Sequence, residues 1–187
     1  MRIYENFLFS NCKKSNNVAY AQHIGNLNIT NDDKLVFLNH CRLLMGYKYF
    51  NRFNNKIAIL RAYKHHGLTG FFGEETVFRN PGTIDEVFLF DHTDENITLR
   101  KGTKDGKSSI VPVHNEWLKD YIDKTGLIPT TGFAAIFLLQ DILGVNKNDI
   151  TLVNFYGSAD NSTSKCTEHD WKYEEKWIAS NMKRVFV

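Results

Sequence analysis

The sequence predicts a single α/β domain, residues 1–187, built around a mainly parallel sheet. Apolar, β-branched and aromatic runs bounded by turn residues alternate with segments of helical periodicity, which is the pattern of this class. Runs such as IAIL, VFLF and ITLVNF are nearly continuously apolar, as in strands that are covered on both faces. The length of 187 residues, with 42% hydrophobic and 24% charged residues, fits one globular domain rather than two.

Each expected strand is an apolar run that ends at turn-forming residues. The expected strands are Ile3–Ser10, Lys34–Cys41, Lys56–Tyr63, Glu86–His92 and Ile150–Tyr156, with a shorter one at Ser109–Val113.

Segments in which apolar residues recur at helical spacing lie between these strands and after the last one. In His114–Lys124, for example, Trp117, Leu118, Tyr121 and Ile122 recur at that spacing. The expected helices are Ser15–His23, His114–Lys124, Thr131–Leu143 and Asp170–Val187, and the expected loops are Gly67–Gly82 and Gly157–Glu168. The second loop is polar and rich in turn residues, so we expect it to lie over a site.

The charge balance and the cysteine content argue against nucleic-acid-binding, disulfide-rich and zinc-stabilised proteins. Lys and Arg number 23 against 21 Asp and Glu, a net charge of +2, which argues against a protein whose main partner is nucleic acid. Three cysteines without a CxxC pair suggest reduced thiols rather than a disulfide framework or structural zinc. The N-terminal residues lack the pattern of a signal peptide, and the longest apolar run, Phe133–Leu139, is too short to cross a bilayer. We therefore expect a cytoplasmic protein.

The C-terminal stretch KWIASNMKRVFV is basic and aromatic. An amphipathic basic helix can lie on a membrane surface, so peripheral membrane contact is one interpretation. We favour the other, in which Trp177, Ile178 and Met182 pack into the core.

The segment Pro129–Gly132, with the sequence PTTG, precedes the clearest helical pattern of the chain. Proline ends the preceding element, a threonine can cap the helix, and Gly132 allows a ligand to approach the backbone. The N–H groups of a first helical turn and the helix dipole favour an anion there. Taken alone, this string is more typical of an ordinary capped helix than of an anion site.

The residues on the C-terminal side of PTTG are more specific. The strand pattern ITLVNFYG ends at Gly157, a polar loop comes next, and His169 is followed by Glu174 after four intervening residues. This order resembles the C-terminal half of the sialyltransferases of glycosyltransferase family 29. Their small sialylmotif, which PTTG, Asp141 and Gly157 match, precedes a very small sialylmotif, which His169 and Glu174 match.

The N-terminal half carries the same resemblance over residues 3–63. FLFSN ends at Asn11, the segment Asp33–Asn39 matches an Asp-x-Val-x-x-x-Asn pattern, and Gly46–Lys48 matches a Gly-Tyr/Phe-Glu stretch in part. The chain departs from the family at Asn6 and Gln140, where luminal members carry a disulfide, and it has no His-Tyr motif in residues 158–168. It thus resembles a minimal, non-luminal form. PTTG-type helices also occur in bacterial sialyltransferases of family 42.

The resemblance implies a single Rossmann-like domain, a variant of the GT-A nucleotide-sugar transferase fold. It implies inverting transfer of sialic acid from CMP-sialic acid to a glycan or glycolipid hydroxyl. His169 would be the general base, since histidine titrates near the required pH, and Glu174 a supporting residue that braces the backbone. The resemblance assigns nucleotide contacts to Asn11, Asn39, Thr130, Thr131, Gly132 and Gly157. Each of these residues also has an ordinary structural interpretation as a turn or cap.

No metal and no cofactor is expected, and the CMP-sugar serves as donor substrate. A leaving monophosphate does not require the metal clamp that diphosphate donors often need, and neither His65–His66 nor Asp91–Asp94 has a third ligand at a suitable spacing. Two alternatives stay open: a transferase that uses CMP-Kdo or another nucleotide sugar, and a non-catalytic nucleotide- or glycan-binding domain.

Overall fold

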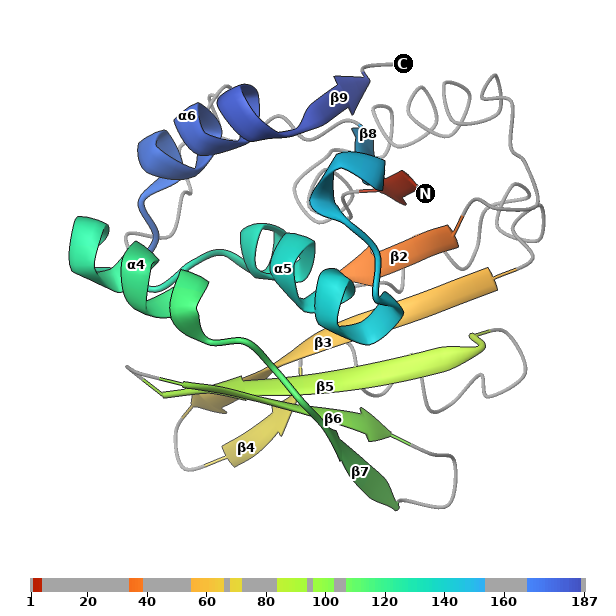
Figure 1. The fold of residues 1–187 in the computed structure, drawn as a ribbon. Coiled ribbons are helices and arrows are strands. Elements are labelled where there is room, and N and C mark those ends of the chain that lie inside the picture. The colour runs from red at the N-terminus through yellow and green to blue at the C-terminus, as the bar shows by residue number, and fades with distance from the viewer. Residues whose placement is uncertain are drawn as a thin grey trace, which may run out of the picture.

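The fold is a mixed α/β arrangement, seen in a computed structural model that describes residues 2–4, 34–38, 55–65, 68–71, 84–93, 96–102, 107–153 and 168–185. Figure 1 shows a twisted sheet with helices packed over one of its faces and a smaller sheet beside the N-terminus. The expected helix at 15–23 lies outside the described residues, as does most of the expected loop at 157–168.

The larger sheet has six strands, in the order β2-β3-β5-β6-β7 with β4 paired to β3. Its strands are β2 (Lys34–Leu38), β3 (Asn55–His65), β4 (Leu68–Phe71), β5 (Glu86–His92), β6 (Ile97–Gly102) and β7 (Ser108–Val111). The pairs β2–β3 and β3–β5 are parallel, whereas β3–β4, β5–β6 and β6–β7 are antiparallel.

The expectation of a mainly parallel sheet is therefore wrong. Short connections after β5 and β6 permit only antiparallel neighbours, because a parallel crossover needs a dozen or more residues. In β6, apolar Ile97 and Leu99 are buried and polar Thr98 between them is exposed. This alternation of apolar and polar residues is the sequence signal of a strand. Part of the expected loop 67–82 is also a strand. Leu68–Phe71 form β4, which pairs antiparallel with β3.

A second, three-stranded sheet joins the two ends of the described chain. It contains β1 (Arg2–Tyr4), β8 (Thr151–Val153) and β9 (Lys183–Val185), in the order β1-β8-β9 with both pairs parallel. β1 also lies beside β2 of the larger sheet.

Three α-helices and one 3-10 turn complete the described fold. They are α4 (Glu116–Thr125), α5 (Thr131–Leu143), η3 (Lys147–Asp149) and α6 (Trp171–Asn181). α4 and α5 both end at glycines with positive φ, Gly126 and Gly144, a conformation that glycine adopts without strain. No helix of the described part is long and apolar enough to span a bilayer.

The C-terminal helix is shorter than expected. It ends at Asn181, and Met182 has extended backbone angles that lead into β9. Pairing of β9 with β8 provides backbone hydrogen bonds that a longer helix would forgo. Ile178 and Met182 are buried, and Trp177 packs at the edge of the core, so these apolar side chains face the protein interior.

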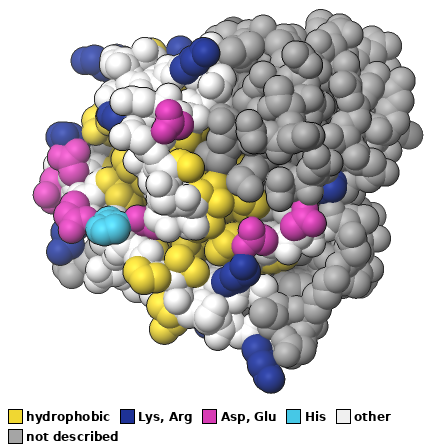
Figure 2. Space-filling model, turned by 45° about the vertical axis from the view of Figure 1, so that its right-hand side comes forward, with side chains coloured by type: hydrophobic (Ala, Val, Ile, Leu, Met, Phe, Trp, Pro, Cys, Tyr) yellow, Lys and Arg dark blue, Asp and Glu magenta, His cyan; other side chains and the backbone are white. Residues whose placement is uncertain are grey.

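The core is centred on α5, which Figure 1 shows between the larger sheet and α6. A helix that is apolar on nearly all sides is expected to be buried, and seven residues of α5 are buried. Ile57, Ile59, Phe88 and Phe90 of the sheet belong to the same cluster as α5. On the face shown in Figure 2, apolar side chains also reach the surface, with charged side chains around them.

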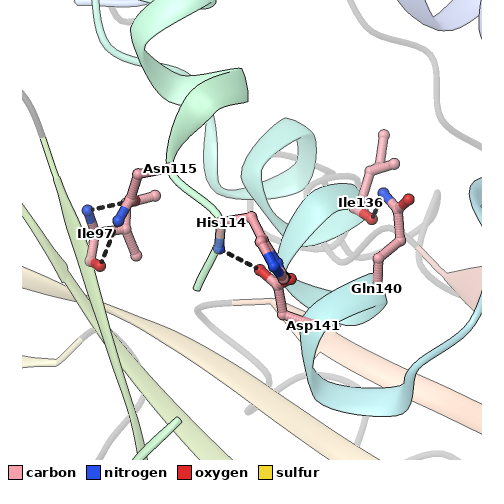
Figure 3. A network of polar contacts seen from close by, with 6 residues as sticks. All are labelled: Ile97, His114, Asn115, Ile136, Gln140 and Asp141. Carbon is pink, nitrogen blue, oxygen red and sulfur yellow. Dashed lines mark hydrogen bonds and ion pairs between the residues drawn. The ribbon is translucent and has the colours of Figure 1, made fainter. Parts of the chain in front are cut away.

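Asn115 connects the start of α4 to β6 (Figure 3). Its Oδ1 accepts the N–H of Ile97 at 2.8 Å, and its Nδ2 faces the Ile97 carbonyl at 3.5 Å. The side chain thus pairs with a strand residue instead of capping its own helix.

Replacement of Asn115 by Ala should reduce the free energy of unfolding by about 1–2 kcal/mol, because the Ile97 N–H loses its acceptor. Asn115→Asp is the matched control, since its carboxylate keeps the acceptor and suits a helix N-terminus. Urea unfolding of the three proteins measures the difference. Equal stability of Asn115→Ala and the wild type would contradict this role.

Candidate functional site

The candidate site is the segment Ile128–Thr130, which leads into the N-terminus of α5. Side chains from three other parts of the chain bind its backbone: Arg61 of β3, His169 before α6, and Glu174 within α6. β3 and β5 run parallel, and Arg61 lies toward their carboxyl ends. Ligands of open α/β sheets bind at this edge.

Thr130 is the N-cap of α5. Its Oγ1 accepts the N–H of Phe133 at 3.0 Å and donates its own proton to Oε2 of Glu174 at 2.6 Å. The N–H of Thr130 donates to Oε1 of Glu174 at 2.7 Å. One carboxylate therefore holds both the backbone and the hydroxyl of the capping residue.

Glu174 is almost fully buried, with 4% of its surface exposed. Tyr121 of α4 donates a third hydrogen bond to Oε1, at 3.0 Å, and its oxygen accepts the N–H of Asp170 at 3.2 Å. Burial raises the pKa of Glu174 to about 7, although the hydrogen bonds from Thr130 and Tyr121 and the charge of Arg61 oppose this rise. Burial likewise raises the pKa of Tyr121, with the carboxylate of Glu174 adding to the effect, so its hydroxyl keeps its proton.

His169 is partly buried, and its Nδ1 lies 2.9 Å from the carbonyl oxygen of Ile128. A carbonyl only accepts, so Nδ1 carries the proton and the basic lone pair of the neutral ring is on Nε2. Burial lowers the pKa of His169, the hydrogen bond to Ile128 opposes this, and the positive charge of Arg61 lowers the pKa further. The ring is thus held as a neutral base, edge-on to Trp171 at 5.7 Å between ring centroids.

Arg61 is the buried cation of the site, with 7% of its surface exposed. Its Nη1 donates to the carbonyl oxygen of Pro129 at 2.9 Å, and its Nη2 lies 3.0 Å from Nε2 of His92. The guanidinium lies over the ring of Phe90, with Cζ of Arg61 at 5.9 Å from the centroid of that ring. Arg61 and Glu174 thus place opposite charges at the two successive residues Pro129 and Thr130.

The structure brings together His169, Glu174 and Thr130 of the residues expected from the sequence. Thr131 and Gly132 form the first turn of α5, and Gly132 is buried. The other three expected contacts, Asn11, Asn39 and Gly157, lie outside the described residues.

Asp141, which matches the small sialylmotif, lies near the other end of α5, about 15 Å along the helix from Thr131. Its carboxylate accepts from Nδ1 of His114 at 2.5 Å and from the backbone N–H of His114 at 3.2 Å (Figure 3). This hydrogen bond raises the pKa of the exposed His114. Asp141 therefore ties the start of α4 to α5 and is not part of the site.

Three residues of the site are not expected from the sequence: Arg61, His92 and Tyr121. Arg61 carries a usable signal, because it is a lone charge that follows the apolar run IAIL. His92 binds Arg61, and within the described residues no group of three His, Cys, Asp or Glu side chains could hold a metal ion. Tyr121 follows the apolar spacing of its helix, which gives no sign that its hydroxyl binds Glu174.

Comparison of the chain with protein-family models, with curated proteins and with solved structures gives no match. Inference about function therefore rests on the geometry of the site and on the motif residues.

Glu174→Gln should change how stability depends on pH. A folded-state pKa of about 7, above the unfolded value of 4.5, means that the contribution of Glu174 is fully present below pH 4.5 and is lost as pH rises through 7. The wild type should therefore lose stability relative to Glu174→Gln between pH 5 and 8, by up to the order of 3 kcal/mol. Urea unfolding at each pH measures this difference.

Tyr121→Phe provides the control, because it removes one donor to Glu174 and keeps the carboxyl group. Its pH-dependent loss should occur at higher pH than in the wild type. A stability difference between wild type and Glu174→Gln that stays constant from pH 5 to 8 would contradict the titration of Glu174.

Proposed function

We propose that this chain is a sialyltransferase-like glycosyltransferase, which transfers sialic acid from CMP-sialic acid to a glycan or glycolipid hydroxyl with inversion. The observation that carries the proposal is the hydrogen bond from Nδ1 of His169 to the Ile128 carbonyl. It leaves Nε2 as a base beside the PTTG segment, and motif order alone gives no such arrangement. The proposed fold is a single-domain variant of the GT-A fold whose larger sheet is mixed.

In the proposed reaction, Nε2 of His169 takes the proton of the acceptor hydroxyl as the acceptor oxygen attacks the anomeric carbon of the donor. The bond from that carbon to the phosphate oxygen breaks in the same step, and CMP leaves with the electron pair. A base that is neutral at pH 7 suits this role. No metal enters the proposed reaction, since the leaving group is a monophosphate.

The donor phosphate is assigned to the start of α5, near Thr131 and Gly132. The dipole of a thirteen-residue helix favours an anion there, and no acidic residue lies in its first turn. Glu174 already occupies the N–H of Thr130, and the buried charge of Arg61 offsets its negative charge. Asn11, Asn39 and Gly157 are proposed to complete the nucleotide pocket.

His169→Asn should lower the transfer rate by about 100-fold or more, because it removes the base. Its Nδ2 replaces Nδ1 as donor to Ile128, so the free energy of unfolding should change little. Transfer is followed by release of CMP from CMP-sialic acid with a glycan acceptor, and stability by urea unfolding. Unchanged turnover in a folded His169→Asn protein would remove His169 from the reaction.

Calorimetric titration with CMP, UMP, GMP and AMP in EDTA tests the donor pocket. We expect CMP to bind selectively without metal, and to bind His169→Asn with the same affinity, because His169 acts on the acceptor. No preference for CMP would reject the CMP-sugar proposal.

Turnover assays then separate the alternatives that remain. Transfer from CMP-Kdo but not from CMP-sialic acid would change the donor and keep the mechanism. CMP binding without turnover of any CMP-sugar, over a panel of glycan and glycolipid acceptors, would support a non-catalytic nucleotide-binding domain instead.

A further inference from the structure

We infer that Arg61 is a positioning residue for His169, acting through the peptide units of Ile128 and Pro129. This inference rests on the proposed function only in assigning the base; the orientation of the imidazole is a property of the folded chain.

The geometry links the two side chains through successive carbonyl groups. His169 donates from Nδ1 to Ile128 at 2.9 Å, and Arg61 donates from Nη1 to Pro129 at 2.9 Å. The pyrrolidine ring fixes φ of Pro129, so ψ of Pro129 is the one soft dihedral left between the two carbonyl groups. Arg61 at the carbonyl of Pro129 and Glu174 at the N–H of Thr130 hold the peptide unit beyond this dihedral, which restricts the directions in which the carbonyl of Ile128 can face His169.

Arg61 is itself held in place from β5. The guanidinium only donates, so the ring of His92 accepts from Nη2, while Phe90 lies beneath the charge. β3 pairs with β5 from Ile57 to Arg61, so the backbone of Arg61 is itself part of the sheet. The position of the guanidinium is thus determined by partners on the sheet and not by the long side chain alone.

Arg61 also acts on His169 through its charge. Burial is the main cause of the lowered pKa of His169, and the hydrogen bond to Ile128 raises it. The charge of Arg61 lowers the pKa further, whereas the carboxylate of Glu168, in the same segment as His169, raises it. The neighbouring acid, Asp170, caps α6 by accepting the N–H of Tyr173, and Glu174 is bound to Thr130 and Tyr121. A cation behind Pro129 therefore favours the neutral ring, which a general base requires.

The experiment compares Arg61→Lys, which keeps the charge but not the planar fork, with Arg61→Gln, which keeps neither. Nitrogen-15 NMR of the full-length protein reports the tautomer and the pKa of His169 without any substrate. Both variants should reduce the population of the Nδ1–H tautomer. Arg61→Lys should lower the pKa of His169, because the hydrogen bond to Ile128 that raises it weakens while the charge stays, and the pKa in Arg61→Gln should lie above that in Arg61→Lys, because the charge is lost.

Kinetics provide the second measurement. Both variants should lower kcat by about tenfold to hundredfold with little change in KM, because a misplaced base affects the chemical step. The acid limb of kcat/KM should lie at higher pH in Arg61→Gln than in Arg61→Lys. If neither variant folds, His92→Gln, which removes only one partner of Arg61, should shift the tautomer in the same direction.

The outcomes separate the two proposals. An unchanged tautomer and pKa of His169 in folded Arg61 variants would overturn the positioning role, whatever their stability. Absence of transfer in the wild type, with the tautomer shift still present, would overturn the proposed function and leave the positioning of His169 by Arg61 intact.

Discussion

The buried carboxylate of Glu174 is the interaction on which the arrangement of the three helices depends. A carboxylate removed from water is costly unless donors surround it, and here Thr130 supplies two and Tyr121 supplies one. Those donors come from the cap of α5 and from α4, while Glu174 itself belongs to α6. A shift of α4 would remove one of these donors and a shift of α5 would remove two, so the donors favour one relative position of the three helices.

Arg61 reaches the same segment from the sheet. It binds the carbonyl of Pro129 while Glu174 binds the N–H of Thr130, so the two side chains hold opposite sides of one peptide unit. Neither charge has to contact the other, because each is bound to backbone groups that lie between them. The entry to α5 is consequently fixed from both the sheet side and the helix side, and His169 takes its orientation from this rigid segment.

Local patterns predict the elements but not these partnerships. α5 begins and ends at the expected residues, Thr131 and Leu143, because a capping threonine, an apolar run and a glycine are all local signals. β5 also has the expected bounds. β6 is missing from the expected strands because apolar and polar residues alternate only over Ile97–Leu99, and the residues that follow are polar. The contacts of Thr130 with Glu174 and of Pro129 with Arg61 join residues far apart in the sequence, and only the folded topology selects them.

The small parallel sheet has a consequence for the order of folding. β5, β6 and β7 are neighbours in sequence and can pair early, whereas Arg2 pairs with Thr151 across most of the chain. Contacts of such long sequence separation form late, because closing the loop costs entropy before any pairing compensates for it. α6 lies between β8 and β9 in the chain, so the helix that carries Glu174 docks among the last elements. During synthesis, the antiparallel strands can therefore assemble before His169 joins the chain and binds the carbonyl of Ile128.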